Sequence, residues 1–168
     1  MSLSMYQASA PRFVNTLNNL SAILDKGAAH ATALKIDPTV LTAARLYPDM
    51  FPLSRQVQIA CDTAKGAVAR LAGVPIPSHE DTERTFDELK ARVAKTVDFV
   101  QGVLPGQIDG TEGRDVTLKL GQREVTWKGA QYLFGFALPN FYFHVTAAYA
   151  ILRHNGVPVG KQDYIGTV

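Results

Sequence analysis

The sequence predicts an all-α protein that folds as one four-helix-bundle domain over residues 1–168. Large apolar residues recur at spacings of three and four in four long segments, the pattern of helices that each bury one stripe. Hydrophobic residues make up 46% of the chain, enough to fill one core without disulfides or a structural metal. Proline and glycine separate the four segments, so each segment has its own start and stop signals.

The first apolar stripe covers residues 6–24. Pro11 lies inside it and is expected either to kink this helix or to mark its first turn. We expect the helix to end near Gly27 and a connection to follow over residues 30–51. Within that connection Asp37 and Pro38 are typical of an N-cap and a first helical residue, which predicts a short accessory helix over residues 38–46.

The second stripe covers residues 53–71 and is closed by Gly73. Pro75 and Pro77 then favour an extended linker over residues 73–81, which at about 3.1 Å per residue spans about 28 Å, close to the length of a twenty-residue helix. Such a linker either returns the chain to the start of the second helix, making the second and third helices parallel, or forms a loose antiparallel turn.

The third helix is expected over residues 86–104, with its charged residues forming a solvated face. Alternating apolar residues at 116–120 and 123–127 flank Gly121 and Gln122, which predicts a small β-hairpin packed against the bundle. The fourth helix is expected over residues 129–155, with Pro139 as a kink and Gly156 as the cap. Two large apolar residues predict that the tail at 161–166 packs on the body.

Charge and cysteine content exclude several classes of function. The net charge of +2 is spread along the chain without a basic run, so neither nucleic acid nor an anionic membrane is an expected partner. The most apolar stretch, residues 132–152, is interrupted by glycine, proline and polar residues and is expected to be a buried helix rather than a membrane span. The single cysteine and an N-terminus without signal-peptide features favour the cytoplasm.

Four polar residues on two helices are the candidate ligand-binding site. Asn140 and His144 are four apart and share a face of the fourth helix, while Gln58 and Asp62 share a face of the second. If Asp62 turns inward toward His144, the pair can bind a divalent metal or act as acid and base. If it turns outward, it pairs with Lys65 or solvent, and His144 is then a histidine that satisfies a polar network in the core.

Cys61 lies in an apolar helix without a histidine or basic residue at helical spacing, so we expect a buried, inert thiol. The aromatic residues of the fourth helix cover more than one face. Core packing accounts for most of them, and a homodimer interface or an apolar pocket is expected to account for the rest.

The chain resembles an uncharacterised bacterial family of the DinB/YfiT-like superfamily of four-helix bundles, many of which are proposed metalloenzymes. The resemblance rests on residues 47–53, 56–65 and 140–156. It implies an up-down-down-up bundle and a metal held by three histidines, one on the second helix and two, four residues apart, on the fourth. Here Asn140 and His144 match the pair, while the second helix has Gln58, Ile59 or Asp62 at the expected histidine, so two of the three histidines are missing.

Two functions of different class follow from these observations. The first is an enzyme that uses Asn140, His144 and Asp62 at one mouth of the bundle, roofed by residues 46–51, with a divalent metal as its conceivable cofactor. The second is a metal-free bundle that binds a small molecule or forms a homodimer. An amide oxygen is a poor ligand for the metals that imidazole binds well, which weighs against metal catalysis.

Overall fold

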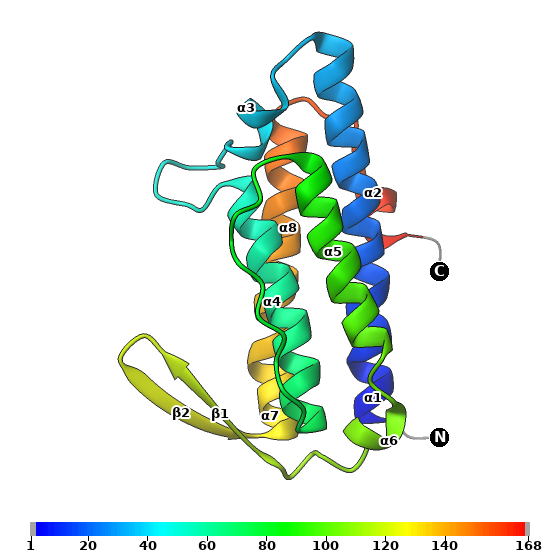
Figure 1. Cartoon of the computed structure of the whole chain (residues 1–168), viewed down its shortest axis with the longest axis vertical. Coiled ribbons are helices and arrows are strands. Elements are labelled where there is room, and N and C mark those ends of the chain that lie inside the picture. The colour runs from blue at the N-terminus through cyan, green and yellow to red at the C-terminus, as the bar shows by residue number, and fades with distance from the viewer. Residues whose placement is uncertain (1–2, 167–168) are drawn as a thin grey trace.

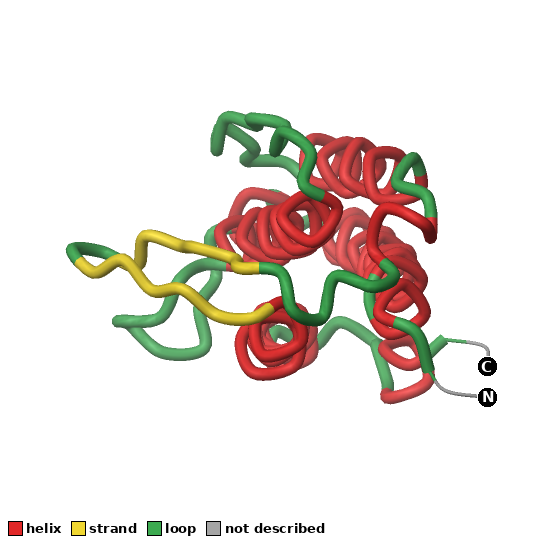
Figure 2. Tube along the Cα trace, turned by 90° about the horizontal axis from the view of Figure 1, so that it is seen from below, coloured by secondary structure: helices red, strands yellow, loops and turns green. Residues whose placement is uncertain are grey.

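The structure is a computed structural model that describes residues 3–166, and it is predominantly helical with one small β-hairpin. Its long helices lie side by side (Figures 1 and 2) and are α2 (Ala10–Leu34), α4 (Leu53–Ala72), α5 (Phe86–Gln101) and α8 (Leu138–His154). The short helices are α1 (Met5–Ala8), α3 (Pro38–Thr42), α6 (Pro105–Ile108), α7 (Gly129–Tyr132) and α9 (Lys161–Ile165). No helix within residues 3–166 has the length and apolar character needed to cross a bilayer.

Helix α2 is longer than the sequence predicted. It begins just before Pro11 and continues through Gly27 to Leu34, so the expected end at Gly27 is wrong. Gly27 is needed there for close packing, because a Cβ at this position would lie 2.8 Å from a ring carbon of Phe86. The helix ends instead at Leu34 and is capped by Lys35, which has a left-handed conformation (φ 56°).

The accessory helix begins where the sequence placed it. The Asp37 carboxylate accepts a hydrogen bond from the backbone N–H of Thr39 at 2.9 Å, which caps α3, and α3 ends at Thr42 rather than near Leu46. Helix α4 follows its predicted limits and is capped by Gly73 in the left-handed conformation (φ 70°).

The proline linker returns along α4, as Figure 1 shows. The C-terminal ends of α4 and α5 lie near each other, because Arg114, in the segment after α5, donates to the carbonyl of Leu71 at the end of α4. Near the start of α4, Asp81 of the linker forms an ion pair with Arg55 in the first turn of that helix. Helix α5 therefore starts beside the start of α4 and runs in the same direction, with no tight antiparallel turn between them. It ends at Gln101, three residues before the expected Leu104.

Pro139 does not break the last long helix. It lacks the N–H that would bond to the carbonyl four residues earlier, and the chain forms a π-helical segment, Leu133–Ala137, immediately before α8. The N–H of Leu138 bonds to the carbonyl of Leu133, five residues back. The expected kink is thus a wider turn within a continuous helical run.

The hairpin matches its prediction. Strands β1 (Asp115–Leu120) and β2 (Arg123–Lys128) pair antiparallel around Gly121 (φ 60°) and Gln122. The indole ring of Trp127 stacks on Phe136 with ring centroids 5.3 Å apart, which attaches the base of the hairpin to the helical run. The tip of the hairpin projects away from the helices (Figure 1). The tail also packs as expected, since α9 lies against α2 and Lys26 pairs with Asp163 at 2.7 Å.

Candidate ligand site at His144

His144 lies in the interior of the bundle and faces Gln56 on α4. His144 is 8% exposed and Gln56 is 1% exposed, and His144 Nδ1 lies 2.7 Å from Gln56 Oε1. Gln56 occupies the apolar stripe of α4, three residues after Leu53 and four before Ala60, so the same periodicity that buries those residues turns its amide inward.

The second hydrogen bond of Gln56 fixes the protonation pattern of the imidazole. Gln56 Nε2 donates to the carbonyl oxygen of Phe51 at 3.1 Å, in the segment that leads into α4. The amide oxygen of Gln56 must then accept from the ring, so Nδ1 of His144 carries the proton and Nε2 keeps its lone pair. Within residues 3–166, Nε2 has no hydrogen-bond partner, and it is not fully buried.

The surroundings also keep the ring neutral. Burial lowers the pKa of His144 below its ordinary value, and the positive charge of Arg55 lowers it further. The ring of Phe143 meets the imidazole edge to face, with centroids 5.2 Å apart. At neutral pH this histidine is therefore an oriented acceptor or base rather than a cation.

An apolar groove lies on the outer side of α8, where Phe143, the residue before His144, is part of its wall. The groove has a volume of about 370 Å³ and lies between α8 and the connection that precedes α4. Its walls come from Leu46, Met50, Pro139, Tyr142, Phe143, Thr146, Ala147 and Ala150. Leu46 and Met50 of the connection before α4 thus form one wall of this groove.

Asn140 lies one turn before His144 and faces the same helix. Its amide Nδ2 donates to Thr63 Oγ1 of α4 at 2.9 Å. Thr63 is seven residues after Gln56, so both lie on the side of α4 that meets α8.

Gln58 and Asp62 do not face His144, which corrects the expectation that they lie across from it. Two residues of helix turn Gln58 by about 200° from Gln56, onto the side of α4 under the linker. There Gln58 is 4% exposed, and its amide donates to Glu83 at 3.0 Å. The shared face of Gln58 and Asp62 was predicted correctly, but Gln56 is the residue that meets His144.

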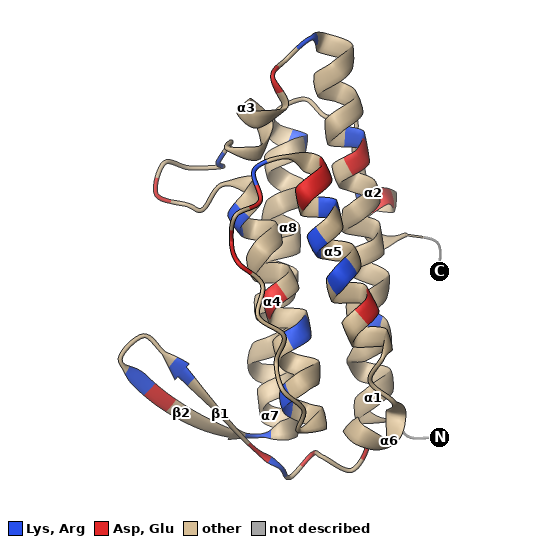
Figure 3. Cartoon of the chain, viewed as in Figure 1, with Lys and Arg blue, Asp and Glu red and all other residues tan. Residues whose placement is uncertain are grey.

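Asp62 belongs to a charge network around the buried Arg92 of α5. Arg92 Nη2 lies 2.8 Å from Asp62 and 3.0 Å from Asp81, and Nη1 lies 3.1 Å from Glu83. The Lys65 ammonium also lies 2.8 Å from Asp62. Figure 3 shows charged residues of both signs on α4, α5 and the linker. The pairing with Lys65 agrees with the outward alternative for Asp62.

Arg92 corrects the prediction of a fully solvated charged face on α5, because it is only 2% exposed. The residues three before, one after and four after Arg92 are Leu89, Val93 and Thr96, and all three are buried. A charged residue inside an apolar stripe is the sequence signal for a buried, paired charge, as Gln56 is for a buried amide.

Cys61 is buried, as predicted, at 0% exposure. Burial raises the pKa of its thiol to about 12. This effect outweighs a hydrogen bond with Thr96 and the positive charge of Arg92, both of which lower the pKa. The thiol is therefore protonated at neutral pH and is neither a nucleophile nor a ready metal ligand.

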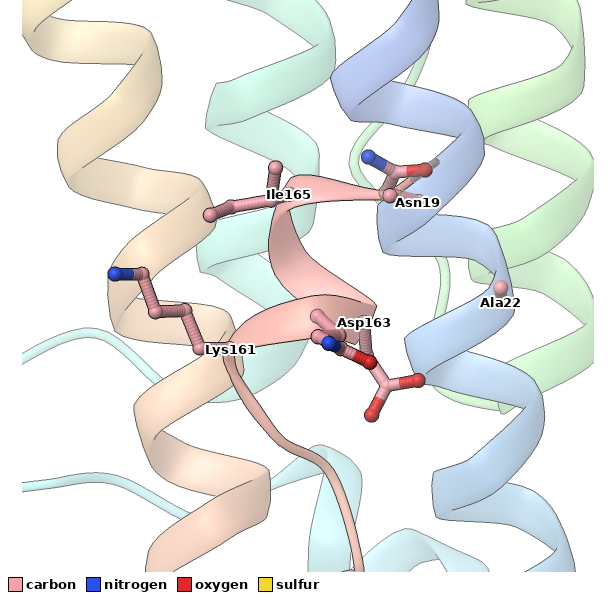
Figure 4. Close-up of a pocket in the computed structure, with 7 residues that line it drawn as sticks. Asn19, Ala22, Lys161, Asp163 and Ile165 are labelled. Atoms are coloured by element: carbon pink, nitrogen blue, oxygen red, sulfur yellow. The ribbon is translucent and has the colours of Figure 1, made fainter. Parts of the chain in front are cut away.

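Another surface hollow, of about 740 Å³, lies between α2 and α9 (Figure 4). Two of its polar side chains already have partners: Asp163 binds Lys26, and Asn19 donates to the carbonyl of Tyr164 at 3.1 Å. Ala22 and Ile165 supply apolar wall but no chemically reactive group. His144 therefore remains the stronger candidate.

The donor atoms near His144 do not fit the three-histidine metal site implied by the resemblance. Gln56 and Asn140 offer amide groups that are already engaged with Phe51, His144 and Thr63. Within residues 3–166 no three His, Cys, Asp or Glu side chains come close enough together to hold a metal ion. One imidazole among amides is a poor donor set for zinc, nickel or iron.

Comparison with known proteins agrees with the resemblance. A crystal structure at 1.83 Å resolution of a DinB family member protein from Shewanella denitrificans is 41% identical to this chain, with a TM-score of 0.88. The match covers 97% of this chain and 92% of the other. No curated protein matches the sequence. Residues 5–165 match the family model described as a domain of unknown function, DUF1993, and the chain belongs to that family.

Proposed function

We propose that the chain is a single up-down-down-up four-helix-bundle domain that binds a small organic molecule at His144 without a metal ion. The parallel course of α4 and α5 and the family match over residues 5–165 support this bundle type. The observation that carries the function is the chain of hydrogen bonds from Phe51 through Gln56 to His144. It orients a neutral imidazole and leaves Nε2 as an acceptor.

The chemistry of the site defines the class of ligand. Nε2 accepts a hydrogen bond, so the ligand carries a hydroxyl, amide or other N–H or O–H donor. The groove beside Phe143 is lined mainly by apolar and aromatic side chains, and we propose that it takes the aromatic or aliphatic body of the ligand. Asn140 supports the same helix pair through Thr63. Gln58 and Asp62 hold the linker, and we assign them no contact with this ligand.

A thermal-shift screen of small aromatic and aliphatic alcohols, amides and acids tests the proposal. Wild-type protein purified without a histidine tag is compared with His144→Ala and with His154→Ala, a matched change at an exposed position on the same helix. We expect hits for wild type and His154→Ala that His144→Ala loses. Elemental analysis of the same sample is expected to give less than stoichiometric metal. Hits that persist in His144→Ala, or a chelator that abolishes them, would contradict the proposal.

A homodimer is the second candidate role. Phe143 is 58% exposed and Phe134 is 51% exposed, and both lie on the helical run that carries the groove. Two large, exposed aromatic rings on one helical run favour association with a second copy. Sedimentation of wild type and Phe143→Ser tests this role: a wild-type dimer weakened by the substitution supports it, and a wild-type monomer at tens of micromolar refutes it.

We also propose that the protein acts in the cytoplasm. The single, buried Cys61 is compatible with a reducing compartment and makes no use of an oxidising one. Localisation of the chain fused to a fluorescent protein at its C-terminus tests this, and export from the cytoplasm would contradict it.

A further inference from the structure

The outer face of α8 differs from those of the other long helices because it carries no charge. Helices α2, α4 and α5 each contain acidic and basic residues, whereas residues 129–152 contain no Lys, Arg, Asp or Glu. The histidine of this stretch, His144, is turned inward to Gln56. A helix face that stays in water normally carries charged and polar residues, so a long uncharged outer face indicates a surface that another molecule covers.

Four residues form a narrow stripe along this face, which we call the seam: Pro139, Phe143, Thr146 and Ala150. Their spacings of four, three and four place them within about 60° of one another around the helix. Pro139, Phe143 and Thr146 are exposed, and Ala150 is half-buried. All four line the groove of about 370 Å³ beside the connection that precedes α4. The same spacing is found where two helices pack side by side along a shared stripe.

Large and small residues are separated along the seam. Its first half holds Pro139 and the ring of Phe143, and its second half holds the small side chains of Thr146 and Ala150. Antiparallel copies therefore place Phe143 of each over the small residues of the other, whereas parallel copies place large against large. The groove over the small residues exceeds the roughly 150 Å³ that holds a benzene ring, so it has room for one phenyl ring. The seam is thus complementary to its own reversed copy.

The elements beside the two ends of the seam are also complementary in charge. Figure 1 shows that the hairpin and the connection before α4 project from the same side of the helices, one near each end of α8. Reversal of a second copy therefore brings the hairpin of one beside the connection of the other. Lys119 and Glu124 are paired across the hairpin, which leaves the exposed Arg123 as the net charge at its tip. Asp49 is an exposed carboxylate of the connection.

We propose that this face docks a second copy of the chain, with the two α8 helices antiparallel about a twofold axis between Phe143 and Thr146. The ring of Phe143 enters the groove of the other copy, and Arg123 lies close to Asp49 of the other copy. This arrangement rests on the homodimer proposed above as the second candidate role. The phenyl ring takes the space of the ligand body, so a ligand at His144 and a second copy compete for one groove, and a bound ligand favours the monomer.

Sedimentation of the full chain over a concentration series tests which face is covered. Phe143→Ala removes the ring that enters the groove, and Ala150→Trp fills the groove from its own helix. We expect each change to weaken the dimer about tenfold or more. Phe134→Ala is the matched control, because Phe134 is 51% exposed against 58% for Phe143 but lies five residues before Pro139, off the spacing of the seam. We expect the control to leave the dissociation constant unchanged.

A charge exchange tests the antiparallel arrangement. Arg123→Asp and Asp49→Arg each place like charges together at both symmetry-related contacts, and we expect each to weaken the dimer about tenfold. The chain that carries both changes restores opposite charges and is expected to dimerise within about threefold of wild type.

The outcomes separate this arrangement from the roles on which it rests. A wild-type dimer that the single exchanges do not weaken, or that the double exchange does not recover, would overturn the antiparallel arrangement. Equal effects of Phe143→Ala and Phe134→Ala would do the same. A wild-type monomer refutes the dimer itself, and the ligand proposal is judged independently by the hits that His144→Ala loses.

Discussion

The imidazole of His144 donates from Nδ1 to the side-chain oxygen of Gln56 across 2.7 Å, joining the middle of α8 to the first turn of α4. The contact is buried and bridges residues 88 positions apart in the sequence. Replacing Gln56 with Ala leaves that donor unpaired and frees the ring to change tautomer. We expect a loss of about 1–3 kcal/mol in unfolding free energy. Urea denaturation measures the loss, and nitrogen NMR of the ring is expected to show mixed tautomers; an unchanged single tautomer would contradict the role of Gln56.

His144 is also expected to make stability depend on pH. Its pKa is lowered in the folded state, so the unfolded chain binds the proton more readily. Stability conferred by the neutral ring is therefore complete above the unfolded value of about 6.5 and declines as the pH falls from there toward the folded pKa. Denaturation of wild type and His144→Ala between pH 5 and 8 tests the sign: the wild type is expected to lose more stability on acidification. His79→Ala is the parallel control, since the pKa of His79 is lowered too.

Asp62 is expected to matter for stability rather than for the ligand at His144. It binds both Arg92 and Lys65, which are almost fully buried, so Asp62→Ala leaves two cations undercompensated. Because Asp62 itself is 38% exposed, we expect a loss of about 2 kcal/mol, below the range for fully buried pairs. Asp25→Ala, which breaks the exposed pair with Lys90, is the control and is expected to cost less than about 1 kcal/mol. Equal losses would contradict a central role for the buried network.

Gly27 is expected to tolerate no side chain, although it lies inside a helix. A Cβ there meets Phe86 at 2.8 Å and Leu152 at 3.2 Å, so Gly27→Ala is expected to cost about 1–3 kcal/mol despite the better helix propensity of alanine. Gly135→Ala is the control, because nothing lies within 4 Å of its Cβ position. Thermal unfolding is expected to show a lower Tm for the first variant only.

Cys61 is expected to react only when the chain unfolds. Burial keeps its thiol protonated and out of reach of a reagent. Labelling with a thiol reagent at neutral pH is therefore expected to be slow in native protein and to accelerate in urea along with unfolding. Native labelling as fast as that of the denatured chain would contradict this.

Helical periodicity predicted most elements because each long helix buries one regular stripe. It failed at Gly27, where glycine serves packing against Phe86, a contact that no local pattern reveals. It also paired Gln58 with His144, because spacing within a helix gives a shared face but not the neighbour of that face. Gln56 and Arg92 carried a usable signal, since each is a polar residue inside an apolar stripe. The ion pairs around Arg92 depend on how the linker passes along α4, which the sequence does not specify.

The π-helical turn before α8 has a consequence for the hairpin and His144 together. It contains one residue more than an α-helical turn, so side chains after it are offset by about 100° from those before it. Tyr132 before the π-helical segment and Phe136 within it meet Trp127, and His144 beyond it meets Gln56. Deleting one residue, for example Gly135, would rotate the helix after the deletion by about 100° relative to the helix before it. The contacts with Trp127 and with Gln56 could then not both be kept. The extra residue thus sets the rotation between the two parts of this helical run, so that one part contacts the hairpin and the other contacts α4.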